Sequence, residues 1–247
     1  MTTKYFSNFN IISYRFGDNE KPVLFDNLSQ YVDVIDGLKD NLSFYNQHTI
    51  ISGERADTLS YKLYGTTDYY WTFFLMNDHL RVSGWPIDAH TILDIAKEKY
   101  PHRTVTTNDV VAANFPVGTV VTGLSSATVG TIVKRDLCMG QLVIDTVDDN
   151  NFDKNESIAY TSEEGAFYVA QLIRESTQYD AVHNYELNGV HQDLPLYDFG
   201  NPGATWTPIT YRDRMERRND ELKTINVLKP SVIDRVVSEF NNFHKES

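Results

Sequence analysis

Cysteine is almost absent from this chain, and the single Cys138 cannot form an internal disulfide. A disulfide framework of the secreted kind is therefore excluded, and nothing in the sequence requires an oxidising compartment. Long apolar runs are absent too: no window approaches the ~18 apolar residues of a membrane-spanning helix, and the first residues lack the apolar core of a signal peptide. We therefore expect a protein that folds in a cytoplasm and has no membrane partner.

Basic residues are scarce relative to acidic ones. The chain has 22 Lys and Arg against 34 Asp and Glu, a formal charge of −12, and its basic residues are scattered. A nucleic-acid-binding surface needs clustered Lys and Arg facing phosphates, so we expect no nucleic-acid partner. The hydrophobic fraction of 41% is enough to bury a core in one large domain or two small ones.

Metal-binding and cofactor-binding motifs are missing. The seven histidines show no HExxH motif and no close His/Cys spacing of a zinc site, and no glycine-rich phosphate loop occurs. The acidic run from Asp145 to Glu156 lacks the alternating ligands and central glycine of an EF-hand loop, and a solvated hairpin turn is the favoured interpretation. The sequence predicts no metal and no cofactor.

Catalytic motifs are missing as well. No Gly-x-Ser-x-Gly elbow is present. Glu163 and Glu164 are adjacent, so on a strand they would point to opposite faces and could not act as a glycosidase pair by themselves. Paired carboxylates can come from distant positions, so an enzyme is unsupported rather than excluded. We predict that the protein is not an enzyme.

The most informative stretch runs from Tyr64 to Asn77, where an aromatic-rich helix is predicted directly after a turn at Gly65. A short β-favouring run, Thr49 to Ile51, and a turn with a capped helix precede it. Residues 79–82 are predicted to form a second short strand that ends before Gly84. Together these elements predict a compact strand-helix-helix-strand unit.

The aromatic side chains of this stretch cannot all face one way, because successive helical residues are separated by about 100°. Those assigned to the core are Tyr70, Phe73 and Phe74. Aromatic residues are favoured at interfaces, so others are assigned to a contact surface. The predicted interaction surface comprises Tyr69, Trp71, Asn77 and Trp85.

The unit resembles a LysM domain, whose signature is a Gly-Asp-Thr-Leu-like turn opening the first helix and an Asn near the close of the second. Tyr64-Gly65 paired with Tyr70-Trp71, Leu75 and Asn77, followed by Gly84-Trp85, is similar to the baseplate wedge subunit of T-even-like contractile-tailed phages, the gene product 53 family. The resemblance covers the two ends of the chain and not the middle.

The expected fold class is α+β, in four segments. Residues 1–47 form an N-terminal arm with a period-two run at Ile12, Tyr14 and Phe16 and one short helix after Leu28. Residues 48–101 form a small LysM-like βααβ unit with a following helix that stops before Pro101. Residues 102–162 form an inserted antiparallel β-barrel-like unit of about five strands. Residues 163–247 form an irregular loop and a C-terminal helix-strand-helix region.

Three finer expectations concern the C-terminal segment. Tyr179 to Trp206 is predicted to be a long surface-following loop, and Thr207-Pro208 to open a helix through Asp220. The strand from Leu222 to Leu228 is predicted to be available to another chain's edge. The last helix, starting at Ser231, is predicted to dock on its own chain through a stripe of apolar residues: Val232, Ile233, Val236, Val237 and Phe240.

The family resemblance implies a non-enzymatic clamp that joins adjacent wedges around the central hub. It implies that other baseplate wedge and hub proteins are the partners, that several copies are present per baseplate, and that the protein lies in the virion tail baseplate after assembly in the host cytoplasm. The alternative is a LysM-type binder of peptidoglycan or chitin, with a site around Gly53 to Asp57 and Asn77 to Leu80. Arg55-Ala56-Asp57 lengthens that turn. A cell-wall hydrolase ranks last.

Overall fold

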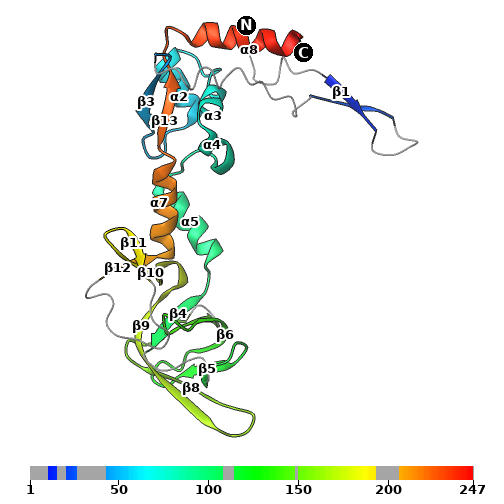
Figure 1. Cartoon of the computed structure of the whole chain (residues 1–247). Coiled ribbons are helices and arrows are strands. Elements are labelled where there is room, and N and C mark those ends of the chain that lie inside the picture. Colours follow the sequence, from blue (N-terminus) through cyan, green and yellow to red (C-terminus); the bar gives the residue numbers. More distant parts are fainter. Residues whose placement is uncertain are drawn as a thin grey trace. The chain divides into compact units, whose positions relative to one another are not determined.

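The computed structural model describes residues 11–15, 21–26, 43–107, 114–147, 150–192 and 206–246. The fold is mixed α+β, as expected, and the chain divides into two compact units. Unit 1 comprises Met1–Asp88 and Arg218–Ser247, and unit 2 comprises Ala89–Arg217 (Figure 1). Unit 2 is thus an insertion within the sequence of unit 1. The short helix predicted after Leu28 lies outside the described residues.

Unit 1 is built on a two-stranded antiparallel sheet. Strand β3 (Tyr45–Thr49) pairs with β13 (Thr224–Leu228), and Ile225 lies opposite His48. Three helices follow β3, namely α2 (Ala56–Tyr64), α3 (Trp71–Met76) and α4 (Asp78–Ser83). Helix α2 ends at Gly65, whose φ of 73° is left-handed and suits a residue without a side chain.

The prediction of a strand at residues 79–82 is wrong, because these residues belong to α4. Asn77 has an extended backbone (φ −132°, ψ 95°) that separates α3 from α4, and Leu80 is buried at 1% exposure. A run of four residues carries too little periodicity to distinguish a strand from one helical turn. The strand that pairs with β3 lies instead at the far end of the chain.

Two hydrophobic clusters hold unit 1 together. The first surrounds Phe73, which is completely buried, and includes Ile50, Leu59, Leu80, Ile225 and Val227. The second joins Trp71, Met76 and Leu228 to helix α8 (Ile233–Glu246) through Ile233, Val237 and Phe240. The predicted docking of the last helix on its own chain is confirmed, with Val236 only partly buried.

The prediction that residues 222–228 offer an edge to another chain is wrong. One edge of β13 pairs with β3. On the other edge, Asn77 bonds the backbone of Asn226, and the Tyr64 hydroxyl donates to the Leu228 carbonyl at 2.9 Å. Side chains therefore occupy the edge that a foreign strand would need.

The N-terminal part of unit 1 contains a hairpin of β1 (Ile11–Tyr14) and β2 (Val23–Asp26), with Ile12 opposite Phe25. The period-two run noted in the sequence at Ile12 and Tyr14 lies in β1. The hairpin's apolar side chains are exposed, with Ile11 at 67% and Leu24 at 66%.

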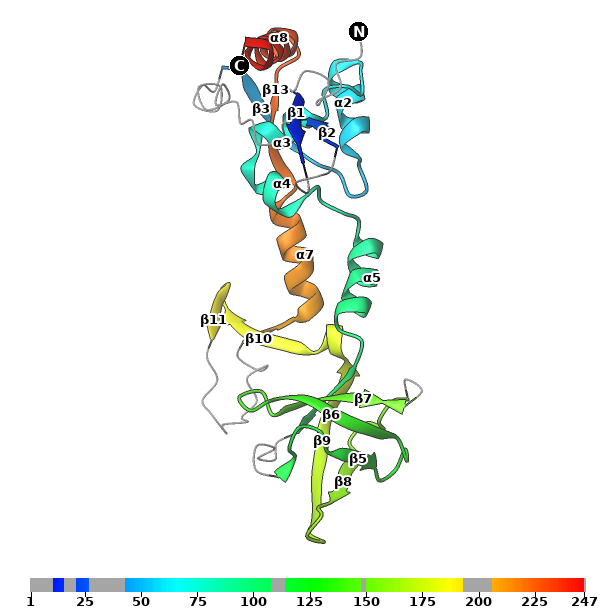
Figure 2. The ribbon, with the colours of Figure 1, turned by 90° about the vertical axis from the view of Figure 1, so that its right-hand side faces the viewer.

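Unit 2 contains a closed antiparallel barrel with the strand order β4-β7-β6-β5-β8-β9 (Figure 2). The strands are β4 (Arg103–Thr107), β5 (Val120–Gly123), β6 (Val129–Asp136), β7 (Gln141–Thr146), β8 (Ser157–Thr161) and β9 (Phe167–Thr177). The barrel has one strand more than expected, because the apolar run after Ala166 forms β9 and closes it against β4.

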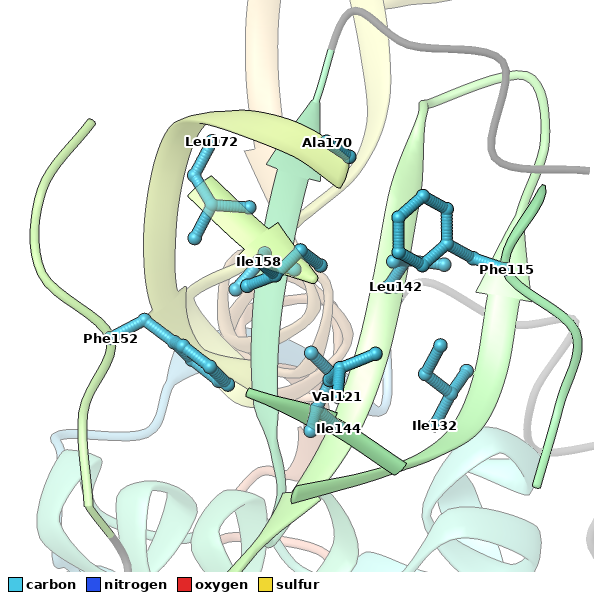
Figure 3. Packing of buried hydrophobic residues seen from close by; sticks show 10 residues of the cluster. Phe115, Val121, Ile132, Leu142, Ile144, Phe152, Ile158, Ala170 and Leu172 are labelled. Carbon is cyan, nitrogen blue, oxygen red and sulfur yellow. The ribbon is translucent and has the colours of Figure 1, made fainter. Parts of the chain in front are cut away.

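The barrel interior is filled by side chains. Its buried cluster (Figure 3) comprises Val105, Phe115, Val121, Ile132, Leu142, Ile144, Phe152, Ile158, Ala170 and Leu172. A Cβ at Gly130 would lie 2.5 Å from the Ile144 Cγ2 atom, so only glycine fits there. Among the described residues the barrel interior is a packed hydrophobic core, as is usual at this strand number.

The remainder of unit 2 contains α5 (Ala89–Lys99), a 3-10 turn, η4 (Gln178–Asp180), and a three-stranded sheet of order β11-β10-β12. Its strands are β10 (Val182–Leu187), β11 (Val190–Gln192) and β12 (Thr207–Thr210). The loop predicted from Tyr179 to Trp206 therefore includes a β-hairpin, and residues 193–205 lie outside the described residues.

Helix α7 (Tyr211–Glu221) begins later than predicted, since Thr207 and Pro208 lie in β12. Thr210 and Asp213 form a reciprocal cap at its start. The Thr210 N–H donates to the Asp213 carboxylate at 2.8 Å, and the Asp213 N–H donates to the Thr210 hydroxyl at 3.0 Å. This capping box, rather than Thr207-Pro208, sets the helix start.

Candidate interaction surfaces

Asn77, which was assigned to the contact surface, is buried at 4% exposure. Its Nδ2 donates to the Asn226 carbonyl at 2.9 Å and to the Phe73 carbonyl at 2.7 Å, and its Oδ1 accepts the Asn226 N–H at 2.8 Å. The carboxamide therefore replaces a neighbouring strand at this point of β13. Asn77 holds the fold together and is not available to a ligand.

Trp71 was also assigned to the contact surface, and the structure corrects this. Its side chain is 5% exposed and packs on Phe240, with ring centroids 4.8 Å apart. Tyr69 is partly buried, and its hydroxyl donates to the Asp234 carboxylate at 2.7 Å. Hydrogen bonding to Asp234, with burial and the Asp234 charge adding to it, raises the pKa of Tyr69 to about 12. Tyr69 and Trp71 therefore both contact α8 and hold it on the rest of unit 1.

Trp85, the fourth of the predicted residues, lines a pocket. It is partly buried, packs against Phe73 and Phe74, and its Nε1–H donates to the Glu54 carbonyl at 2.6 Å. The pocket has a volume of about 410 Å³, and its wall is formed by Arg55, Ala56, Asp57, Tyr70, Phe74 and Trp85. We call it the aromatic pocket.

Tyr70 is 42% exposed at this pocket, although it was assigned to the core. Tyr70 and Trp71 have therefore exchanged the positions expected of them. Tyr70 and Phe74 are four residues apart, which places them on one face of a helix, and that spacing was the signal that could have found the pocket wall.

Charged groups at the aromatic pocket are paired with each other. The Arg55 guanidinium bonds both carboxylate oxygens of Asp57, at 3.1 and 3.0 Å, and this contact holds the pKa of Asp57 below its usual value. Burial opposes ionisation of the adjacent Glu54, but its hydrogen bond to Lys62 at 2.6 Å and its other contacts lower its pKa. The charges of the Arg55–Asp57 and Lys62–Glu54 pairs therefore cancel, and the remaining wall residues are Ala56 and three aromatics: Tyr70, Phe74 and Trp85.

Such a wall suits a flat, weakly polar group. Aromatic faces bind the apolar face of a sugar ring or the side chain of a peptide, and the Arg55–Asp57 pair offers both donors and acceptors at the rim. The Arg55 side chain keeps 80% of its surface exposed, so a ligand that bonds its guanidinium would remain partly in solvent.

The acidic run has a structural role at its C-terminal end. The Glu156 carboxylate accepts the Ser125 N–H at 2.9 Å, the Ser126 N–H at 3.0 Å and the Ser126 hydroxyl at 2.8 Å, and it also bonds the Asp153 N–H. Burial would raise the pKa of Glu156, but these bonds lower it. The carboxylate thus ties barrel loops together, while residues 148–149 lie outside the described residues.

Other chemistry is limited in the parts of the chain that the structure describes. No group of three or more His, Cys, Asp or Glu residues there is arranged to hold a metal ion. Cys138 is an exposed free thiol. Among the described helices, none is both long and apolar enough to cross a membrane.

Comparison with known proteins identifies no family for this chain. No family model matches it, and no curated protein matches it.

Proposed function

We propose that this chain is a structural baseplate wedge protein of a contractile phage tail, which clamps neighbouring wedge and hub subunits during assembly. In this proposal it is a virion protein with several copies per baseplate, it acts without catalysis, and its partners are other baseplate proteins. The family assignment rests on the residues of the Tyr64 to Trp85 stretch.

The arrangement of unit 1 supports a LysM-like unit with a divided sequence. LysM-like units place two helices between two strands of one small sheet. Here β3, α2 and α3 follow one another, and β13 supplies the antiparallel partner strand from the far side of the insertion. The proposed unit therefore consists of β3, α2 and α3, and its closing strand β13 is reached only after α4 and unit 2.

The observation that carries the proposal is the β1–β2 hairpin. Its exposed apolar side chains are Ile11, Ile12, Tyr14, Val23, Leu24 and Phe25, on strands of four residues each. Because cross-strand partners point to the same face, Ile12, Tyr14, Val23 and Phe25 share one face of the ribbon, and Ile11 and Leu24 lie on the other. Exposed apolar side chains gathered in this way are typical of a protein–protein contact. A clamp needs such an arm, whereas a small monomeric binding protein does not.

The proposal predicts which proteins accompany the chain in its source. The full-length protein, tagged and expressed where tail particles form, should co-purify with baseplate components identified by mass spectrometry. The double variant Ile11→Ser/Leu24→Ser should remain folded and lose these partners. Val82→Ser is the matched control, because Val82 is 87% exposed on α4 outside the hairpin. Retention of all partners by the double variant would contradict the role of the hairpin.

The aromatic pocket favours one second candidate, a LysM-type binder of peptidoglycan or chitin fragments. Titration with chitin and peptidoglycan oligomers separates the two functions, and a clamp should show no saturable binding at submillimolar ligand. Tyr70→Ala removes a wall of the pocket, while Tyr61→Ala is the control, because Tyr61 is 63% exposed on α2 and does not line the pocket. A micromolar isotherm lost only in Tyr70→Ala would place glycan binding first.

A further inference from the structure

The β3–β13 sheet of unit 1 has two different edges. Side chains bond the backbone at the β13 edge, whereas the backbone groups at the β3 edge have no such partners in the described ranges. The Lys229 N–H donates to the Phe44 carbonyl, and the Ile50 N–H donates to the Lys223 carbonyl. Because the groups of an antiparallel strand alternate in direction, the N–H and C=O of residues 46 and 48 face β13, and those of residues 45, 47 and 49 face outward. Within the described ranges no hydrogen bond reaches these outward groups.

The open edge contrasts with the opposite one. On β13, the side chains of Asn77 and Tyr64 occupy the outward groups of Asn226 and Leu228. On β3, Gln47 and Thr49 are exposed and carry no charge that would repel an incoming strand. An edge with unpaired backbone groups is a template for an added strand.

The β1–β2 hairpin, on the same chain, has exposed apolar side chains. A two-stranded ribbon gains stability in water when a third strand is added to it. In the described fold the side chains of Ile11 and Leu24 remain two-thirds exposed. The same chain thus carries a ribbon that exposes Ile11 and Leu24, and a strand, β3, whose outward backbone groups can accept an added strand.

We infer that the β1–β2 hairpin of one copy adds to the β3 edge of a second copy. The inference rests on the proposed function, which places several copies in one baseplate. The chain between Asp26 and Ser43 has a maximum reach of roughly 50 Å at about 3.3 Å per residue, enough to pass to a neighbour. Each copy would give one hairpin and receive one, and such a heterologous contact closes when the copies form a ring.

Crosslinking of two single-cysteine variants tests the exchange in the full-length chain. Cys138→Ser removes the native thiol, one chain then carries Ser13→Cys on β1, and the other carries Thr49→Cys on β3. Mixed at high concentration and treated with a short bismaleimide, the two chains should give a heterodimer. The heterodimer should be at least several-fold more abundant than the homodimer formed by either variant alone.

The substitution Gln47→Pro tests whether the β3 edge itself receives the hairpin. It removes an outward N–H that β13 does not use, so Gln47→Pro in the Thr49→Cys chain should leave the melting temperature nearly unchanged and abolish the heterodimer. His48→Pro is the matched control, because it removes a group that faces β13 and should lower the melting temperature.

Three results would overturn the inference. An intramolecular crosslink in the Ser13→Cys/Thr49→Cys double variant, without dimers, would mean that the hairpin docks on its own chain. Heterodimers that persist with Gln47→Pro would place the hairpin on another surface. The absence of any crosslink would exclude the contact between copies. None of these results depends on co-purification with baseplate proteins, so failure here and failure of the proposed function can be told apart.

Discussion

Asn77 and Asn226 are joined as if they belonged to neighbouring strands, although 149 positions separate them in the sequence. The Asn77 carboxamide bonds both the N–H and the C=O of Asn226, at 2.8 and 2.9 Å. Asn219 repeats the arrangement with Ile87, whose N–H and C=O it bonds at 2.8 and 3.0 Å. Both asparagines are buried, so each amide replaces a backbone partner that the fold does not supply.

Asn77→Ala should destabilise unit 1. It leaves the N–H and C=O of Asn226 without their partner next to a packed core, and we expect a loss of roughly 2–4 kcal/mol in the free energy of unfolding. Urea unfolding measures the loss. Asn46→Ala, on the exposed side of β3, is the control and should change stability by less than about 0.5 kcal/mol. Equal stability of the two variants would mean that water replaces the Asn77 amide.

Tyr70 and Trp71 should respond oppositely to truncation. Trp71→Ala removes a buried ring that contacts Phe240 and should cost roughly 3–5 kcal/mol. Tyr70→Ala removes an exposed ring and should cost less than about 1 kcal/mol, while changing any binding at the aromatic pocket. Thermal melts of both variants check this. A larger effect of Tyr70→Ala would reverse the structural assignment of the two residues.

Tyr70 and Trp71 illustrate which features of the fold can be predicted from the sequence and which cannot. The helices around Leu59 and Ile92, the apolar stripe of the last helix and the β-rich middle could be predicted, because local periodicity encodes them. Which of two adjacent aromatics is buried depends on α8, an element more than 150 positions away. Local patterns carry no information about such distant contacts.

The pairing partner of β3 could not be predicted for the same reason. Residues 79–82 are near β3 in sequence and have a β-favouring residue, Val82, but the sheet takes Thr224–Leu228 instead. The aromatic pocket was partly predictable from the sequence: Trp85, which lines it, was among the residues assigned to a contact surface, while Tyr70 and Arg55 needed the fold to bring them together. The edge of β3 became visible only once its pairing was known.

Alkaline pH should loosen the attachment of α8. The pKa of Tyr69 is raised from about 10 to about 12, because its neutral hydroxyl donates to Asp234. A raised folded-state pKa contributes stability that is complete below pH 10 and is lost as the pH rises through about 12. Unfolding free energy measured across this range should fall less steeply in Tyr69→Phe than in the unchanged chain. Identical pH profiles would show that the Tyr69–Asp234 bond adds no stability.

Truncation after Lys229 should destabilise the isolated chain. It removes Ile233, Val237 and Phe240, each at most 4% exposed, from the cluster around Trp71. Burial of such side chains contributes roughly 1.5–3 kcal/mol each, so the loss should exceed about 4 kcal/mol, a large part of a typical domain's stability. Calorimetry of the truncated monomer gives the answer. An unchanged melt, with failure only in particle assembly, would make α8 a contact between subunits.

Unit 1 should fold without unit 2, because the points where the chain leaves and re-enters unit 1 are held together. The Asn219 side chain bonds both backbone groups of Ile87, so the two ends of the insertion lie within a side chain's length of each other. Replacing residues 89–217 by a short Gly/Ser linker therefore closes a small gap at little cost in loop entropy. We expect one cooperative thermal transition of the shortened chain.

Adding Asn219→Ala to the shortened chain tests why it folds. The change removes the bond across the junction and should lower the melting temperature of the shortened chain by several degrees, since the Ile87 N–H and C=O lose their partner. Asp220→Ala, a neighbouring change whose carboxylate pairs with Lys223 at the surface, serves as the control and should have little effect. If the shortened chain has no cooperative transition even with Asn219 in place, unit 1 depends on unit 2 for its core, and the division of the chain into an insertion and its host is wrong.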